Sequence, residues 1–324
     1  MRMNDTVDGV AERVRALLES GEGKERIGRF NKLAARVEKS IPTLMEMKKK
    51  LHQRARMQLY INVADAQHAS DTQAVRMSVR VHGCKCGTVR VDSDGKRTFT
   101  PSNPGLFERY GYDEARGLEW GDAPVADFIK RCVEAVDKGE VKTGKPEASV
   151  EAKLIARMKL ESGGWWCQKP VCLAGIPLQI PLPIAAAGPE PKLGDGHIDV
   201  LARLGRGGKG LRVYEIKAPR AGVETALDQA VGYMAALKVA LTQTDTSAGP
   251  WWTLIGFSKR PKRTPRFEAV ACVADNTKNR EQLEKACKRL EAGNHENIVV
   301  GAVFYSYDAS GRLRLRPRRT SPYL

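Results

Sequence analysis

Apolar side chains recur along the chain with two different spacings, and these spacings predict its helices and strands. Near the N-terminus they return every three or four positions, which predicts helices over residues 6–19 and 24–39. Ser40-Ile41-Pro42 predicts a break, because proline removes a backbone donor inside a helix. A third helix is expected to begin near Thr43, so the chain opens as a helical region.

Further along, the apolar spacing becomes two, which is typical of strands buried on one face. Antiparallel strands are predicted at 59–63, 75–81, 89–91 and 98–100. After a loop, a helix is expected from Asp122 to Lys138, with Asp122 as its N-cap. The polar stretch 139–146 predicts a linker, which divides the chain into an N-terminal α+β domain at 1–138 and a second domain at 147–324.

The second domain is expected to follow the order helix, three strands, helix, strand, and then to extend its sheet. Helices are predicted at 147–160, 223–241 and 277–292, and strands at 165–173, 198–201, 213–217, 251–257, 267–273 and 298–307. A proline-rich loop is expected between Pro177 and Pro191. This order predicts an α/β fold with a mixed sheet.

Charged residues interrupt two of the predicted strands. Asp199 lies inside Ile198–Leu201, and Glu215 and Lys217 lie inside Val213–Lys217. Alternation places Glu215 and Lys217 on one face, and pairing of the two strands as a hairpin brings Asp199 beside Glu215. Buried like charges repel one another, and a divalent cation with oxygen ligands would remove that conflict.

This constellation resembles the core of the PD-(D/E)xK nuclease superfamily. Gly196-His197-Ile198-Asp199 matches a G-x-x-D motif, and Glu215-Ile216-Lys217 matches E-x-K. Gln229-Ala230-Val231-Gly232-Tyr233 matches the Q-x-x-x-Y motif of the RecB-like branch. The resemblance covers roughly residues 147–257, and it implies a restriction-endonuclease-like αβββαβ core.

The resemblance also implies a site and an activity. Asp199 and Glu215 would bind Mg²⁺, or Mn²⁺ in its place, together with one acidic residue of the preceding helix. For that residue Glu151 is the first choice, ahead of Glu147 and Glu161. Lys217 would position or activate the attacking water, and Gln229 and Tyr233 would support the site.

The implied function is a metal-dependent nuclease, with DNA as the favoured substrate and bacterial restriction or anti-phage defence as the setting by analogy. Two alternatives stay open: an RNA nuclease, and a catalytically silent nucleic-acid-binding or scaffold protein of the same fold. The N-terminal domain would recognise the target or a protein partner, and a homo-oligomer is an open possibility.

Net charge agrees with a polyanionic partner. The formal net charge is +16; residues 1–146 carry 27 basic and 21 acidic residues, and residues 147–324 carry 27 and 17. A basic loop follows the predicted strand 251–257 and is the expected nucleic-acid contact. Its cations are Lys259, Arg260, Lys262, Arg263 and Arg266. A second basic run, from Lys48 to Arg56, suits a solvated helix end better than a phosphate contact.

Other sequence features bear on location. The chain contains no apolar run near the 18 or so residues that a membrane span requires, so no membrane partner is expected. The amphipathic, partly acidic N-terminus is unlike a secretory signal, and seven cysteines suit reduced thiols. These features predict a cytoplasmic protein.

Overall fold

A computed structural model of the chain provides the fold. It describes residues 6–46, 57–62, 74–92, 94–102, 107–141, 146–160, 168–173, 175–186, 190–205, 210–242, 248–261, 264–292 and 294–319. The basic run 48–56, Trp165–Cys167, Glu161, Lys262 and Arg263 fall outside these ranges.

Helices and strands are interspersed along the described chain, as the apolar spacing predicts. The helices are α1 (Val7–Glu19), α2 (Gly21–Glu46), the short η3 (Glu108–Tyr110) and α4 (Tyr112–Ala115), α5 (Ala123–Asp137), α6 (Pro146–Leu160), α7 (Val223–Thr242), α8 (Ala248–Leu254) and α9 (Thr277–Glu291). The strands are β1 (Met57–Ile61), β2 (Val75–Val81), β3 (Cys84–Val91), β4 (Arg97–Pro101), β5 (Gln168–Pro170), β6 (Cys172–Leu173), β7 (Ile176–Ala185), β8 (Lys192–Ile198), β9 (Val200–Leu204), β10 (Gly210–Ile216), β11 (Arg266–Ala274), β12 (Ile298–Tyr307) and β13 (Leu313–Arg319).

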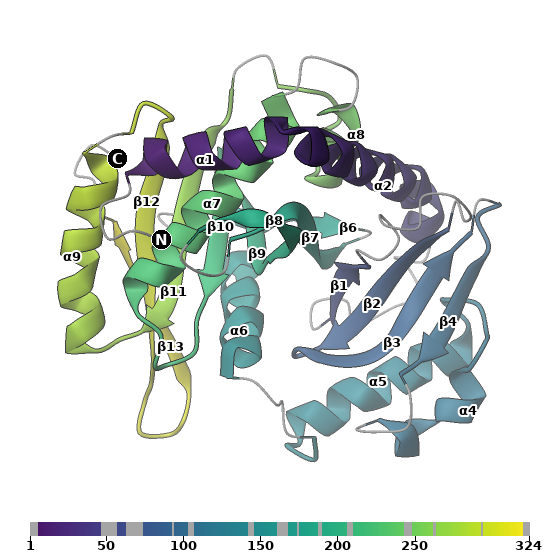
Figure 1. Cartoon of the computed structure of the whole chain (residues 1–324). Coiled ribbons are helices and arrows are strands. Elements are labelled where there is room, and N and C mark those ends of the chain that lie inside the picture. The colour runs from purple at the N-terminus through teal and green to yellow at the C-terminus, as the bar shows by residue number, and fades with distance from the viewer. Residues whose placement is uncertain are drawn as a thin grey trace.

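The described strands form two sheets, which confirms the expected α/β class with mixed pairing. The first has the order β4-β3-β2-β1-β7-β6, with β8 also paired to β7; the second has the order β13-β12-β11-β10-β9-β5. In the second sheet β10, β11 and β12 run parallel, while β9 and β13 are antiparallel to their neighbours. In Figure 1, α1 and α2 cross the top of the molecule and the two sheets lie below them.

Helices cover both faces of the second sheet. The apolar residues of α7 lie in a core that also receives side chains of α1, α2, α9 and both sheets. A smaller core lies on the other face of the second sheet, where Val150, Leu154 and Met158 of α6 pack against Tyr214 and Val270. The Asp199–Glu215 region therefore lies at the end of a sheet that is covered on both sides.

The N-terminal and C-terminal parts of the chain share a sheet and a core. β1 pairs in parallel with β7, with Leu59 opposite Leu178 and Tyr60 opposite Gln179. Side chains of α1, α2 and β1 lie in the same core as those of α7. The predicted linker at 139–146 thus joins two parts that contact each other through a strand pair.

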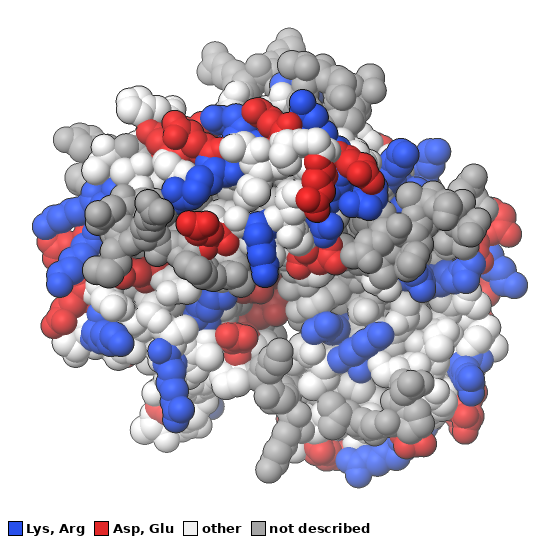
Figure 2. All heavy atoms as spheres, viewed as in Figure 1, with Lys and Arg blue, Asp and Glu red and all other residues white. Residues whose placement is uncertain are grey.

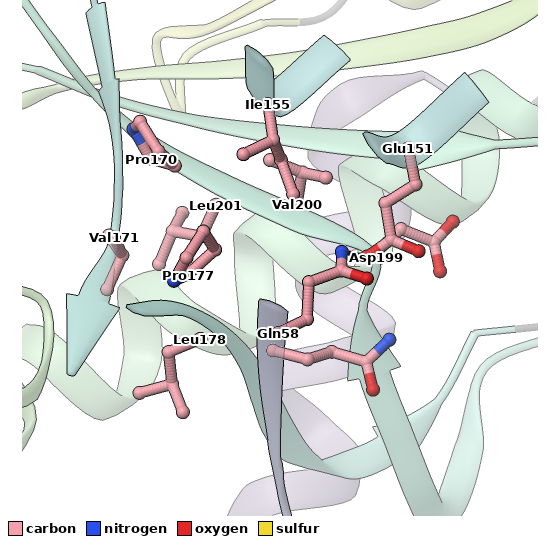
Figure 3. Close-up of a pocket in the computed structure, with 11 residues that line it drawn as sticks. Gln58, Glu151, Ile155, Pro170, Val171, Pro177, Leu178, Asp199, Val200 and Leu201 are labelled. Carbon is pink, nitrogen blue, oxygen red and sulfur yellow. Dashed lines mark hydrogen bonds between the residues drawn. The ribbon is translucent and has the colours of Figure 1, made fainter. Parts of the chain in front are cut away.

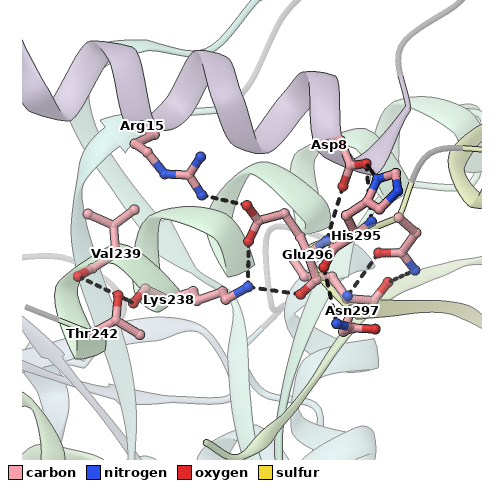
Figure 4. Close-up of polar contacts among 10 residues, drawn as sticks. Asp8, Arg15, Lys238, Val239, Thr242, His295, Glu296 and Asn297 are labelled. Atoms are coloured by element: carbon pink, nitrogen blue, oxygen red, sulfur yellow. Dashed lines mark hydrogen bonds and ion pairs between the residues drawn. The ribbon is translucent and has the colours of Figure 1, made fainter.

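Polar contacts also fix α1 to the turn before β12 (Figure 4). Asp8 accepts backbone hydrogen bonds from His295 and Glu296, both at 3.1 Å. The carboxylate of Glu296 pairs with Arg15 of α1 at 2.5 Å and with Lys238 of α7. One half-buried carboxylate therefore joins three segments that lie far apart in the sequence.

The helix α2 continues where a break was predicted. It runs from Gly21 to Glu46 with Pro42 inside it. Proline removes one intrahelical hydrogen bond but keeps a helical φ, and the packing of Phe30, Leu33 and Val37 against the core holds the helix that precedes it. The prediction of a separate third helix was wrong.

The proline-rich loop was also predicted wrongly, because most of it is strand β7. Its even-numbered residues from Ile176 to Ile184 are buried and apolar, and the prolines occupy odd positions between them. The pairing with β8 shifts register between Leu182 and Ile184, so Pro183 lies in an irregularity where its missing N–H is tolerated.

The predicted strand at 251–257 is wrong as well, because this segment forms the helix α8 and a following turn. Pro250 lies in the first turn of α8, a position that favours helix initiation. Trp251 and Trp252 are buried, and the Trp251 indole donates to Asn31 of α2 at 2.7 Å. Burial of large rings against α2 thus outweighs their preference for strands.

None of the helices that the structure describes is long and apolar enough to cross a membrane.

Candidate active site

Asp199 lies at the bend between β8 and β9, where the chain passes from one sheet to the other. Tyr214 is opposite Val200 in the β9–β10 register, so Asp199 continues the ladder beside Glu215. Its Oδ2 accepts a 2.7 Å hydrogen bond from the backbone N–H of Ile216. The predicted juxtaposition of Asp199 and Glu215 is therefore present, and a backbone hydrogen bond fixes it.

Glu215 and Lys217 lie on one face at the carboxyl end of β10, as alternation predicts. Lys217 Nζ and Glu215 Oε1 are 2.5 Å apart. Glu215 is only 2% exposed, and its Oε2 is buried without a hydrogen-bond partner among the described atoms. The backbone carbonyl of Lys217 accepts a 2.8 Å hydrogen bond from the Tyr305 hydroxyl, which holds this end of β10 in place.

The helix α6 brings two acidic residues to this corner. Glu151 is buried and accepts hydrogen bonds from Gln58 Nε2 at 2.6 Å and from the Tyr60 hydroxyl at 3.2 Å. Glu147, one turn earlier, accepts from the backbone N–H of Ala218 at 2.9 Å. Figure 3 shows the carboxyl group of Glu151 beside Asp199, and the charge of Glu147 also acts on Asp199, Glu215 and Lys217.

Electrostatics make this corner unfavourable for negative charge. Burial and the neighbouring Asp199 raise the pKa of Glu151 to about 8, and burial raises the pKa of Asp199 to about 6 against the opposing hydrogen bond from Ile216. Burial and Asp199 also raise the pKa of Glu215 well above its usual value. Burial alone would lower the pKa of Lys217, but Glu215 and Asp199 outweigh it and raise that pKa. The ammonium therefore stays charged at neutral pH.

A small cavity lies beside the carboxyl groups (Figure 3). Its volume is about 10 Å³, and its polar end is formed by Gln58, Glu151, Gln179 and Asp199. The other end is apolar and includes Ile155 and Leu201. This space is near that of a single water molecule.

Gln229 and Tyr233 lie one turn apart on α7 and are joined by a 3.2 Å hydrogen bond from the amide to the hydroxyl. Both are buried. The charges of Glu215 and Asp199 contribute to a raised pKa of Tyr233, after burial as the main cause. The phenol therefore lies near both carboxyl groups, and Gln229 holds it by donating to its hydroxyl.

Gly196, the first residue of the G-x-x-D motif, lies where β8 passes close to other groups. A Cβ at this position would lie 1.9 Å from the Ile184 carbonyl oxygen and 2.8 Å from the Tyr233 ring. The absence of a side chain thus lets β8 approach both β7 and Tyr233.

Arg266, at the described end of the basic loop, is not brought to this corner. Arg266 is opposite Gly210 in the parallel β10–β11 register, whereas Glu215 is opposite Ala271. Five residues of extended strand separate the two positions, or about 17 Å. Lys259 and Arg260 are exposed, and Arg266 pairs with Glu268 at 2.8 Å.

The donor chemistry of the corner fits a divalent cation such as Mg²⁺. Asp199 and Glu215 offer carboxylate oxygens, and one buried oxygen of Glu215 has no partner. Mg²⁺ commonly takes one or two carboxylates with water and substrate phosphate as its other ligands. In the described part of the chain, however, no group of three or more His, Cys, Asp or Glu side chains is arranged to hold a metal ion. The arrangement therefore fits a cation that is bound by two carboxylates, those of Asp199 and Glu215. Glu151 either lies outside the ligand set or would have to move to join it.

The sequence alone did not indicate the contributions of the first sheet. Gln58 and Tyr60 bind Glu151, and the guanidinium of Arg80 lies 4.0 Å from the centre of the Tyr60 ring. Their only signal was position: each occupies the polar face of a strand whose other face is apolar. Nothing in the sequence spacing shows that β1 pairs with β7 and so reaches Asp199.

Comparison of the chain with protein-family models, curated proteins and solved structures found no match.

Proposed function

We propose that the protein is a metal-dependent phosphodiester hydrolase that acts on nucleic acid, with DNA as the favoured substrate. The observation that carries this proposal is the corner formed by Asp199, Glu215 and Glu151, where the buried carboxyl groups of Glu215 and Glu151 lie beside the half-buried Asp199 and Lys217 pairs with Glu215. Such a corner is costly for a fold unless charge of the opposite sign binds there. Acidic groups with raised pKa values beside a charged lysine are a feature of catalytic sites.

Asp199 and Glu215 would hold the cation, which when bound would activate water and neutralise charge on the phosphate. The neighbouring residues have separate tasks. Lys217 keeps its proton because two carboxylates raise its pKa, so it would donate to the phosphate or to the attacking water and would not act as a base. Gln58 and Tyr60 orient the carboxyl group of Glu151 by donating to it.

One observation favours the rival reading, a nucleic-acid-binding protein without catalysis. Lys217 already pairs with Glu215 at 2.5 Å, so in this conformation the ion pair satisfies part of the charge that a cation would otherwise meet. For hydrolysis, Lys217 would have to share the Glu215 carboxylate with the cation or release it.

The test is cleavage by the purified full chain of linear duplex DNA, closed circular DNA, single-stranded DNA and RNA, with Mg²⁺, with Mn²⁺ and with EDTA. The variants are Glu215→Gln and Lys217→Met, and the matched control is Glu284→Gln, an acid-to-amide change on the exposed face of α9. We expect metal-dependent DNA cleavage that falls by about 100-fold or more in both site variants. The control should cleave like the wild type.

The outcomes separate the possibilities. Cleavage of closed circles would show endonuclease action, and cleavage of linear DNA alone would show dependence on ends. RNA cleavage without DNA cleavage would make RNA the substrate and leave the assignment of the site unchanged. Absence of cleavage on all four substrates, with salt-sensitive binding retained, would overturn hydrolysis in favour of binding.

A further inference from the structure

The first sheet has one apolar face and one basic face. Val75, Met77, Val79 and Val81 of β2 are buried, and the residues between them point the other way. The described cations on this second face of β1–β4 are Arg76, Arg80, Lys85 and Arg90. Within these four strands the described part of that face carries no carboxylate; Asp92, just after β3, pairs with Arg90 at 2.6 Å. A merely solvated sheet face would more often mix both signs.

This basic face is continuous with the corner formed by Asp199, Glu215 and Glu151, which we call the carboxyl corner. The strand registers place Tyr60 opposite Ser78, Ser78 opposite Thr88, and Thr88 opposite Thr100. Tyr60 is also opposite Gln179 on β7, which borders the cavity beside Asp199. One row of polar side chains therefore runs across the sheet from the site to the outer strand β4.

A wide groove lies over the outer part of this row. Its volume is about 710 Å³, and the residues that line it are Arg76, Lys85, Thr88, Arg90, Thr100, Pro101 and Ser102. In Figure 2, viewed as in Figure 1, Lys and Arg side chains lie over β2 and β3 beside a hollow in this face of the molecule. Apart from Pro101, each lining side chain offers an N–H or O–H donor, and such donors are the usual partners of phosphate oxygens.

The chemistry of the groove favours the backbone of duplex DNA over a single strand. Proteins that bind single strands stack bases on aromatic rings. On the described part of this face the aromatic ring is that of Tyr60, and the Arg80 guanidinium already covers it at 4.0 Å. From β1 to β4 the face spans about 14 Å, which is the rise of about four base pairs.

We propose that the polar face of β1–β4 is a binding surface for duplex DNA that leads the phosphodiester backbone to the carboxyl corner. This inference rests on the proposed function, and it assigns Lys85, Arg90 and Arg76 to phosphate contacts. The Arg90–Asp92 pair is half-exposed, so a phosphate can displace the carboxylate at little cost. Arg266, at the far end of the second sheet, and the other described cations of the basic loop, Lys259 and Arg260, are not part of this surface.

The test measures the Kd of a fluorescently labelled 20-base-pair duplex for the full chain by anisotropy, in EDTA and at several salt concentrations. The variant pair is Lys85→Gln with Arg90→Gln. The matched control is Lys278→Gln with Lys285→Gln, which removes the same charge from the exposed face of α9. We expect the first pair to weaken binding at least tenfold and to reduce the salt dependence by about two counterions. The control pair should change Kd less than threefold.

A second arm uses Lys259→Gln with Arg260→Gln and a single-stranded probe of the same length. The proposed binding surface would be overturned, even with cleavage intact, by either of two results. One is an equal Kd for wild type and the Lys85/Arg90 variant; the other is a larger loss of affinity in the Lys259/Arg260 variant than in the Lys85/Arg90 variant. Tighter binding of the single strand than of the duplex would overturn the duplex assignment. Absence of cleavage by wild type, with duplex binding lost in the Lys85/Arg90 variant, would overturn hydrolysis and leave the surface standing.

Discussion

At the scale of single residues, the carboxyl groups of Asp199, Glu215 and Glu151 work against the stability of the protein when nothing binds them. Glu215 and Glu151 are buried and Asp199 is half-buried, and the pKa of each is raised. A group whose pKa is raised on folding holds a proton that the unfolded chain has lost, so the free energy of unfolding falls as pH rises through that interval. The interval extends from about pH 4 to about pH 8 for Asp199 and Glu151 together.

Asp199→Asn should therefore stabilise the metal-free protein at pH 8. Asparagine can still accept the hydrogen bond from Ile216 but carries no charge beside Glu215. We expect the free energy of unfolding to rise by on the order of 2 kcal/mol at pH 8, and to change little at pH 4.5, where wild-type Asp199 is protonated in the fold. Urea denaturation in EDTA at the two pH values measures both quantities.

The control substitution for that prediction should change the free energy of unfolding in the opposite direction. Asp308 is partly exposed at the surface, and its pKa is lowered to about 2 by hydrogen bonds from Ser310 and Arg312. Its stabilising contribution is present above pH 4 and is lost as pH falls toward 2, so Asp308→Asn should destabilise at pH 8. Stabilisation by both variants, or by neither, would contradict the assignment of strain to the carboxyl corner.

Gly196→Ala should destabilise the fold, because the added methyl group meets the Ile184 carbonyl oxygen and the Tyr233 ring. Both neighbours are fixed, one by the β7–β8 ladder and one by burial. We expect a loss of about 2–3 kcal/mol in the free energy of unfolding. Gly28→Ala is the matched control: it lies in α2 with open space around its Cβ position and should stabilise slightly through helix propensity.

Most of the residue-level juxtaposition followed from short-range rules. Alternation brought Glu215 and Lys217 together, and hairpin pairing brought Asp199 beside Glu215. Gln58 and Tyr60 could not be assigned in this way, because they reach Glu151 through a parallel strand pair between positions more than 100 residues apart in the sequence. Periodicity reports which face of a strand is buried, and it carries no information on such a partner.

At the scale of elements, helices and strands with a clean apolar spacing were predicted well and those with mixed signals were not. The helices at 123–137, 223–242 and 277–291 match their predictions within a few residues. In β7, by contrast, proline at odd-numbered positions concealed an apolar period of two, and α8, which carries two tryptophans, was predicted as a strand. In both places burial against a distant element decided the outcome.

Attachment of α1 to the turn before β12 also belongs to this scale, and Glu296→Gln tests it. Burial opposes ionisation of Glu296, but hydrogen bonds and charge from Lys238 and Arg15 outweigh it and lower its pKa. Its contribution is therefore present above about pH 4.5 and is lost as pH falls below that value. We expect Glu296→Gln to lower the free energy of unfolding by about 1–2 kcal/mol at pH 7, and by less at pH 4.

The comparison for Glu296 is Glu284, whose pair with Lys288 lies on the exposed surface of α9. Glu284→Gln should leave the free energy of unfolding nearly unchanged, because water screens an exposed ion pair. Equal effects of the two substitutions would mean that α1 is held by its apolar face alone. Thermal and urea unfolding of the full chain distinguish the cases.

At the scale of the whole molecule, one sheet and one hydrophobic core extend across the predicted domain boundary at 139–146. β1 pairs with β7, and Gln58 and Tyr60 bind Glu151 of α6. The basic face of the first sheet adjoins the carboxyl corner of the second part of the chain. Recognition and chemistry would therefore share one continuous surface, built from both sides of the boundary.

Separate expression of residues 139–324 tests whether that boundary delimits an independent unit. Without β1, one edge of β7 lacks its partner, the apolar residues of α7 lose α1, and Glu151 loses both of its donors. We expect this segment to lack a cooperative unfolding transition and to recover one when residues 1–138 are added in trans, since an unpaired buried edge and an uncovered apolar helix both favour association. Circular dichroism melts of the segment, of the mixture and of the full chain provide the comparison. A cooperative melt of the segment alone, with metal-dependent cleavage retained, would show that the second domain folds and acts by itself, and that β1 and the basic face contribute to binding rather than to the integrity of the site.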